Sequence, residues 1–456
     1  MKSFKIDMKK LIILSISALA ATTQAQTVWT AQQCMQYAVE HNTQVRRAAL
    51  ELDNYEASKL SAIGSFLPAA SGSIGMQYNF GRAIDPETNG YTDVSTFYNG
   101  YSVSASLPVF DGFSRVNALK AAKASVLMGR NALREQQDQT ALATLQAWVN
   151  AMYYEGTVAM AEEKQRETDL LLRQTQVMVE VGRKSAADLA QIESQHAEAA
   201  YDLTRQENLR ASALLDLKRQ MSIDLDTTVS IFVPIIETAS SNAWNQQCQS
   251  LEPTVPMLGT NGANGWHPAL QQQYHSMRAR LYEWRQARAA LLPALSLSAG
   301  LSTTYYHTLH QPSAASFGDQ FKNNMGEYIG ATLSIPLFNR LQSITSIRRA
   351  KNNYRMAREA YEDKQQELQK LAREAWQDWQ GYLKQTQQME KKVEADSLAY
   401  QLTRRQYEEG LSTAIDLHTT STQLLQSKAT LLQCQLMAMV KRELVRYYNG
   451  ETIWTE

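Results

Sequence analysis

The feature that most constrains this chain is an internal repeat. Ser-Leu-Pro-Val-Phe at residues 106–110 recurs as Ser-Ile-Pro-Leu-Phe at 334–338, and Glu180–Leu189 recurs as Glu408–Leu417, both at an offset of 228. The Pro68 and Pro293 segments match at an offset of 225, which places a three-residue insertion in the loop between the matched segments. Similarity at a fixed offset indicates that one structural plan is used twice.

The two halves share one order of elements: an opening helix, a β-hairpin, a long helix without proline and a returning helix. The first repeat is predicted to span 26–222, with a hairpin at 66–110, a long helix at 112–181 and a returning helix at 185–221. The second is predicted to span 266–456, with the corresponding elements at 292–337, 341–409 and 413–448. We expect the opening helices at Ala31–Ile63 and His267–Leu291. Residues 223–265, rich in Asn, Gly, Pro, Ser and Thr, are predicted to form a linker of loops with one short strand at Val229–Val233.

The long helical stretches carry a heptad pattern. Matching positions recur every seventh residue from Ile347 to Met389 and, one repeat earlier, from Leu119 to Ala161. A sustained period of 3.5 residues indicates helices that supercoil against neighbours. About 70 residues at 1.5 Å each give roughly 100 Å of helix, far more than a globular core needs. Because an ordinary bundle would leave such seams exposed, the pattern favours a long tube or coiled-coil rod.

The strand-like runs alternate apolar and small polar side chains over about ten residues, the length of a tilted membrane strand. The residues predicted to face lipid are Ile74, Met76, Leu297, Leu333 and Ile335, and those predicted to face a lumen are Ser73, Gln77, Ser298 and Ser334. Aromatic residues gather near the loop ends, as in a membrane girdle; they are Tyr78, Phe80, Phe97, Tyr98, Tyr101, Tyr305, Tyr306 and Tyr328. A soluble sandwich half covered by helices is the alternative. Because four strands cannot close a barrel, the membrane interpretation requires several copies to share one.

The N-terminus indicates export. Lys9 and Lys10 precede an apolar stretch, and Thr23-Gln24-Ala25 offers small residues for cleavage, so residues 1–25 are predicted to be a signal peptide cleaved near Ala25. The mature chain then carries 41 basic and 44 acidic residues, a net charge of −3, which gives no case for nucleic acid. No later stretch is long and apolar enough for a membrane helix. The three cysteines have no metal-ligand spacing.

Over essentially the whole mature chain the sequence resembles the TolC-like outer membrane factors. The resemblance rests on the opening Trp29-Thr30-Ala31-Gln32-Gln33 segment, the Ala290–Ser296 helix-to-strand junction, the two Pro-x-Phe junctions and the two Gly-x-x-[Ser/Thr]-x-x-Asp-Leu turns. The loop at residues 81–86 is similar to members from Bacteroidetes-type bacteria. The resemblance implies a mainly α-helical fold with membrane β-strands. It also implies a homotrimer whose chains share a 12-stranded outer-membrane barrel, continued by a periplasmic α-barrel that docks onto an adaptor and an inner-membrane pump.

Two kinds of site are expected from these motifs. Gly182 and Gly410 fit the C-termini of the long helices, and Ser185 and Thr413 fit the N-caps of the returning helices, with Asp188 and Asp416 three residues on. The resemblance implies that these turns dock the adaptor and that Asp416 lines a closed periplasmic mouth; Asp188, at the corresponding position of the first turn, is the second candidate for this constriction. The family's second acid corresponds to Thr419, so only part of that constriction is present. The helix–strand junctions are marked by Pro68, Pro108, Pro293 and Pro336.

The remaining candidate side chains indicate neither a metal site nor a catalytic site. His307 and His310, in a predicted loop near Asp319, lack a third ligand with proper spacing, so no metal and no cofactor are expected. Trp376 and Trp379 are expected to pack on a helix. No nucleophile–base group, phosphate loop or paired-carboxylate motif is present, so the chain is not expected to be an enzyme. A transport duct is the favoured function; a passive porin and a structural coiled-coil protein are the alternatives.

Overall fold

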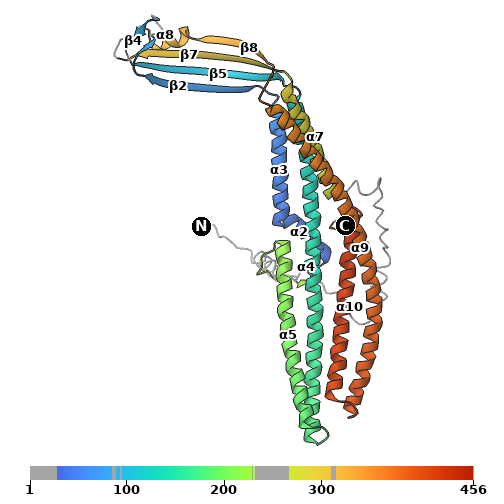
Figure 1. Ribbon diagram of the computed structural model, residues 1–456. Helices are drawn as coiled ribbons and strands as arrows, with labels where there is room; N and C mark the ends of the chain where they lie inside the picture. Colours follow the sequence, from blue (N-terminus) through green and yellow to red (C-terminus); the bar gives the residue numbers. More distant parts are fainter. Residues whose placement is uncertain are drawn as a thin grey trace, which may run out of the picture. The chain divides into compact units, whose positions relative to one another are not determined.

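The computed structural model in Figure 1 describes residues 28–84, 89–92, 95–227, 230–231, 267–309 and 315–454. The chain divides into two compact units, which we describe separately. The strand-bearing unit comprises Ala48–Leu133 and Pro268–Gln366. The helical unit comprises Met1–Arg47, Arg134–His267 and Glu367–Glu456. The strand-bearing unit takes one segment from each predicted repeat, so the duplication is visible in how the chain is divided.

The strand-bearing unit contains a four-stranded antiparallel sheet in the order β2-β5-β7-β8 (Figure 1). The strands are β2 (Ala69–Asn79), β5 (Thr96–Phe110), β7 (Ala294–Thr308) and β8 (Gly326–Ser334). Each repeat contributes one hairpin, and β5 pairs with β7 to join them. A further short ladder, β3 (Ala83–Ile84) with β4 (Tyr91–Thr92), extends the first hairpin. Among the described strands, the outer edges of β2 and β8 have no partner.

The register of the sheet places the two predicted sets of side chains on opposite faces. Ile74 lies opposite Tyr101, which lies opposite Thr303, and Leu297 shares that face because side chains alternate along β7. On the other face Ser73 lies opposite Ser102, with 2.7 Å between their hydroxyl oxygens. The apolar face carries Ile74, Met76, Leu297 and Leu333, and the polar face carries Ser73, Gln77, Ser298 and Ser334. Ile335 lies just beyond the end of β8.

Aromatic side chains gather at the loop end of the sheet on both of its faces. Tyr78 and Phe97 are paired on the apolar face with ring centroids 4.8 Å apart, and Phe97 contacts Tyr305 at 6.2 Å. Tyr98 lies opposite Tyr306 on the polar face. The alternation of a strand therefore divides the predicted girdle between two faces, and only part of it can meet lipid.

A short helix, α8 (Phe317–Asn323), lies where the sequence predicted only a polar loop. Phe321 packs on Tyr101 with ring centroids 5.4 Å apart. The Gln320 side chain accepts a hydrogen bond from the Tyr306 backbone nitrogen at 2.9 Å and donates one to the Tyr306 carbonyl at 3.0 Å. The strand β7 extends past the end of β8, so this helix satisfies backbone groups that β8 does not reach.

The strands pass into long helices through matched junctions. Helix α4 (Ser114–Glu180) follows Gly112 and Phe113, at φ 66° and 67°, and helix α9 (Gln342–Glu408) follows Arg340 and Leu341, at φ 55° and 64°. Each pair is left-handed, and the two pairs are 228 residues apart. At the first junction glycine is required, because a Cβ on Gly112 would lie 2.9 Å from the Ala289 carbonyl oxygen.

Three of the four predicted junction prolines lie outside the strands. Pro68 and Pro293 precede β2 and β7, and Pro336 follows β8. Pro108, in contrast, lies inside β5, which continues to Phe110. The pairing with β7 shifts between these two residues, as expected because proline has no N–H for the ladder.

Two shorter helices lead into the sheet. Helix α3 (Thr43–Gly64) precedes β2, and helix α7 (Pro268–Arg288), continued by the 3-10 turn η2 (Ala289–Leu291), precedes β7. Aromatic stacking holds α7 to α9: the rings of Trp284 and Tyr354 lie 5.9 Å apart and nearly parallel. This order of helix, hairpin and long helix is the order that the repeat predicts.

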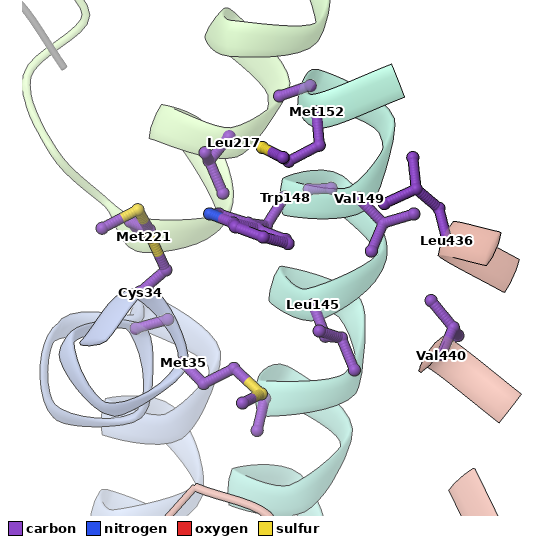
Figure 2. Close-up of a cluster of buried hydrophobic side chains, with 14 of the residues drawn as sticks. Cys34, Met35, Leu145, Trp148, Val149, Met152, Leu217, Met221, Leu436 and Val440 are labelled. Carbon is purple, nitrogen blue, oxygen red and sulfur yellow. The ribbon is translucent and has the colours of Figure 1, made fainter. Parts of the chain in front are cut away.

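The helical unit contains α2 (Ala31–His41), α5 (Ala186–Met221), α10 (Ala414–Tyr448) and the distal parts of α4 and α9. Helix α5 returns along α4, and α10 returns along α9 (Figure 1). Figure 2 shows the main core, in which the indole of Trp148 lies among Leu217, Met221 and Met152. Cys34 on α2 joins the same cluster and is fully buried.

The opening helix of the first repeat, predicted as one element over Ala31–Ile63, is broken at Asn42. This residue has an extended backbone, and its side-chain oxygen accepts a hydrogen bond from Gln44 N at 2.7 Å, which caps α3. Its amide nitrogen donates to the Gln220 carbonyl at 2.8 Å. Asparagine thus ends one helix and begins the next, as its short polar side chain permits.

The termini of the described chain pack on the helical unit. Trp454 Nε1 donates to Asp138 at 2.9 Å, and the Tyr447 hydroxyl lies 3.0 Å from both carboxylate oxygens of Glu135. Near the other end, β1 (Val28–Trp29) pairs in parallel with β6 (Ser230–Ile231). The latter covers part of the predicted strand Val229–Val233, whose other residues lie outside the described chain. Within the described residues, no helix is both long enough and apolar enough to span a membrane.

Candidate functional site

The turns between the long and returning helices are the candidate site, and both follow one geometry. At the first turn Gly182 is left-handed at φ 73°, and Arg183 N donates to the Met178 carbonyl at 2.8 Å. The second turn has the same left-handed glycine, Gly410, at φ 81°. Both turns make the paired backbone hydrogen bonds of a Schellman motif. The predicted C-terminal role of these glycines is confirmed.

Each returning helix begins with a reciprocal capping box. Ser185 Oγ accepts a hydrogen bond from Asp188 N at 3.1 Å, and the Asp188 carboxylate accepts from Ser185 N at 3.1 Å. Thr413 Oγ1 likewise accepts from Asp416 N at 3.1 Å, and Asp416 accepts from Thr413 N at 3.2 Å. Each hydroxyl also donates to its aspartate. The predicted capping of both helices is confirmed.

The same hydrogen bonds lower the pKa of both aspartates. For Asp416 the cause is the hydroxyl of Thr413, followed by the Thr413 backbone N–H, and for Asp188 it is the same pair of groups on Ser185. The capping therefore favours the charged form, so both carboxylates are ionised at neutral pH. Asp416 is exposed and Asp188 is half-buried. Two fixed negative charges thus lie at the two turns of each chain.

Side chains between the hairpins hold the two turns together within the helical unit. Tyr407 is buried, and its hydroxyl lies 3.3 Å from Thr175 Oγ1. The Lys184 ammonium lies over the Tyr407 ring at 4.0 Å, and Gln195 Nε2 donates to the Ala414 carbonyl at 3.2 Å. These cross-hairpin contacts were not predicted. A single sequence gives no signal for them, because they depend on how separate helices pack.

The two turns differ in charge although they share a backbone. Glu180–Leu189 contains Arg183 and Lys184 beside two acids, whereas Glu408–Leu417 contains three acids and no base. The second turn also exposes apolar side chains, since Leu411 is 76% and Ile415 63% exposed. Thr419, at the position of the family's second acid, uses its hydroxyl to bond the Ile415 carbonyl at 2.9 Å. The acidic character is therefore concentrated on the second turn, which also exposes two large apolar side chains where the first turn exposes one, Val181 at 63%.

A partly buried layer of charges lies further along the hairpins and was also not predicted. Glu167 lies 3.8 Å from Lys164 and 3.6 Å from Arg404. Burial lowers the pKa of Lys164 and raises that of Glu167, against the opposing effect of their mutual attraction. Lys428 lies 3.9 Å from Glu163 in the same layer. The layer links α4, α9 and α10 by pairs of opposite charge.

The remaining candidates of the sequence take structural places. His307 belongs to β7 and not to a loop, and His310 lies outside the described residues. Asp319 lies in the first turn of α8, where its backbone N–H donates to the N-cap Ser316 and its carboxylate accepts from the Ser316 hydroxyl. No cluster of three possible metal-ligating side chains occurs in the part of the chain that the structure describes. Trp379 is buried as predicted, with its ring 5.2 Å from that of Trp376. The described cysteines Cys34 and Cys434 are unpaired.

Each repeat supplies one β-hairpin to a single open four-stranded sheet and one very long helical hairpin, which is the plan of the class of TolC-like ducts. The family model described as outer membrane efflux protein matches residues 34–221 and 262–443, which is most of the chain. The chain therefore belongs to the outer membrane efflux protein family, and the resemblance noted in the sequence is confirmed.

Individual relatives are distant in sequence but similar in fold. The outer membrane efflux protein BepC of Brucella suis is 20% identical over 343 residues, which cover 75% of this chain and 68% of BepC. The outer membrane protein VceC of Vibrio cholerae superimposes with a TM-score of 0.76 at 13% identity, covering 93% of this chain and 96% of VceC. The CmeC outer membrane channel of Campylobacter jejuni superimposes with a TM-score of 0.75 at 16% identity, covering 99% of this chain and 93% of CmeC.

Proposed function

We propose that this protein is the outer-membrane exit duct of a tripartite efflux or type I secretion system. In this role three copies form one continuous channel from the periplasm to the cell exterior. A periplasmic adaptor and an inner-membrane pump deliver substrates to it. The observation that carries the proposal is the four-stranded sheet with one apolar face, one polar face and two edges that no described strand pairs.

The sheet supports a shared barrel. In lipid every backbone N–H and C=O needs an internal partner, so an open sheet cannot remain with the bare edges of β2 and β8. Pairing β8 of one copy with β2 of the next satisfies both edges, and three copies supply twelve strands. The serine-rich face, with Ser73 and Ser102 hydrogen-bonded across strands, then lines the lumen.

The helices support a duct that continues beyond the membrane. Helices α4 and α9 each have 67 residues, which corresponds to roughly 100 Å of continuous helix. A passive porin needs no such helices, and a structural coiled-coil protein needs no sheet with an apolar face. The porin alternative therefore leaves the long helices without a role, and the coiled-coil alternative leaves the sheet without one.

The helix turns are the proposed docking and gating sites. Gly182 with Ser185 and Gly410 with Thr413 make rigid, capped turns at the ends of the hairpins, which an adaptor can contact. Asp416 is an exposed, ionised carboxylate on the more acidic turn, and a three-fold axis would bring three copies of it together. Such a ring attracts cations. Asp188 is the weaker candidate, because Arg183 and Lys184 lie beside it.

Fractionation and adaptor capture test the proposal together. We expect the mature chain in the outer-membrane fraction and expect it to retain a tagged periplasmic adaptor from the same organism after mild crosslinking. A Leu411→Glu variant should lose the adaptor but keep its outer-membrane location, because it alters only the exposed apolar surface of the second turn. Recovery of the chain from the periplasmic fraction, or from the outer membrane with no adaptor at any crosslinker concentration, would overturn the proposal.

A further inference from the structure

Within the strand-bearing unit, basic residues are concentrated at the end of the sheet where the helices begin. The collar is defined here as residues 57–68, 111–120, 285–293 and 335–349, which comprise the helix–strand junctions and about the nearest two turns of each helix. Its basic residues are Lys59, Arg115, Lys120, Arg285, Arg288, Arg340, Arg348 and Arg349. Asp111 is its one acidic residue. The loop ends of the same strands, residues 80–95 and 309–327, have the opposite bias, with five acids and two bases.

These basic charges are largely uncompensated within the chain. Only Arg115 is paired inside the collar, with 3.0 Å between its Nε and Asp111. In the described residues no carboxylate forms an ion pair with Arg340, Arg348 or Arg349, and all three side chains are exposed. In a symmetric oligomer, collars brought together add like charges and do not neutralise one another. The exposed positive charge of the collar is therefore available to a negatively charged partner molecule.

Exposed apolar side chains occupy the same zone, immediately beside the strand ends. Leu337 is 93% exposed, Phe338 78% and Leu67 65%. Arg115 spans this boundary: its guanidinium lies over the Phe66 ring at 5.3 Å. Large apolar groups followed along the helix by Arg and Lys are suited to the boundary between acyl chains and phosphates, where the apolar stem enters lipid and the charge reaches the headgroups.

We propose that the collar binds the anionic phospholipid headgroups of the membrane leaflet on the helix side of the barrel. The inference rests on the proposed function, since it requires the sheet to lie in the outer membrane with its helices in the periplasm. Arg348 and Arg349 on α9 and Arg288 on α7 contact lipid phosphates, while Leu337 and Phe338 enter the acyl region. An Arg or Lys near an anionic surface contributes about fivefold in affinity. The collar thus fixes the depth of the barrel in the leaflet.

The test uses the full-length oligomer purified in a neutral detergent. It is incubated with equal amounts of dioleoyl phosphatidylglycerol and dioleoyl phosphatidylcholine, and the retained lipid is quantified after gel filtration. We expect phosphatidylglycerol to be retained about fivefold over phosphatidylcholine or more. The variant R348Q/R349Q should lose most of this preference.

The matched control is R355Q/R358Q, on the same helix. It removes the same charge from exposed side chains that lie about 20 Å or more along α9 from its first residue, and it should keep the preference of the wild type. Glycerol phosphate, added as a soluble competitor, should not displace the retained lipid. Equal retention of both lipids by the wild type, equal loss in both variants, or displacement by glycerol phosphate would overturn the lipid collar.

The oligomer mass and the outer-membrane location are measured on the same preparations. If the protein is an outer-membrane oligomer without lipid preference, the lipid-binding role of the collar is rejected and the proposed function stands. If the chain is absent from the outer membrane, both proposals are rejected.

Discussion

At the scale of single residues, two left-handed glycines illustrate different constraints. Gly410 has open space around its missing Cβ, so only the backbone conformation requires glycine there. At Gly112 the backbone is also left-handed, but a Cβ would lie 2.8 Å from the Leu292 Cβ and 2.9 Å from the Ala289 carbonyl oxygen. Gly410 permits a turn, whereas Gly112 permits both a left-handed backbone and a close contact between the start of α4 and the 3-10 turn that follows α7.

We therefore expect Gly112→Ala to be the more damaging change. Gly410→Ala should cost about 1 kcal/mol for the left-handed backbone. Gly112→Ala should cost about 2–4 kcal/mol, since the overlap with Ala289 and Leu292 adds to the backbone term. Melting temperatures of the detergent-solubilised variants measure the difference. Equal losses would show that the contact at the strand–helix junction relaxes freely.

Substitution of Asp416 tests whether this capping residue also acts as a gate. Asp416→Asn removes the charge while retaining a side-chain oxygen that can accept from Thr413 N. We expect reduced cation preference and weaker block by trivalent cations in single-channel recordings. Asp188→Asn is the matched control, with the same cap but basic neighbours, and should have a smaller effect. If selectivity and block in Asp416→Asn equal those of the wild type, the aspartate only caps its helix.

The capping residues could be predicted from sequence because their partners lie three positions away. Ser185 with Asp188 and Thr413 with Asp416 are local pairs, and local hydrogen bonds follow from spacing. The contact of Lys184 with Tyr407 joins residues more than 200 positions apart, and no local pattern encodes it. The capping hydrogen bonds within each turn were therefore predictable, whereas the packing of one turn against the other was not.

At the scale of elements, alternation in the strands predicted the two faces of the sheet. Ile74 and Leu297 share one face, and Ser73 and Ser298 share the other, because a period of two leaves no other arrangement within a regular ladder. The exceptions have physical causes. Asn42 divides the opening helix by capping the next one, and α8 forms because Gln320 satisfies the unpaired Tyr306 backbone. Both depend on backbone partners that pattern alone does not identify.

The faces of the sheet should differ in their tolerance of charge. Leu297→Arg, on the apolar face, should cost roughly 2–4 kcal/mol if it lies near mid-membrane, whereas Ser298→Arg, one residue further on the polar face, should cost little. Unfolding of the reconstituted protein in denaturant measures both. Equal tolerance of the two substitutions would show that the apolar face does not meet lipid.

At the scale of the whole molecule, duplication explains why both units combine segments from the two halves of the chain. Each repeat supplies one hairpin to the sheet and one long helical hairpin to the helical unit. The repeat predicted this plan because its offset is constant across strands and turns. The sheet is incomplete in one copy, since no described strand pairs with the outer edges of β2 and β8 while one face of the sheet is apolar. Completion by identical copies is the central claim.

The mass of the complex extracted from the outer membrane tests that claim most directly. Native mass spectrometry in a mild detergent should give three times the mass of the mature chain, because twelve strands close the barrel. The subunits should separate only when the protein is denatured. A stable monomer that conducts ions after reconstitution would contradict the account, since one chain would then close a pore that four strands cannot form.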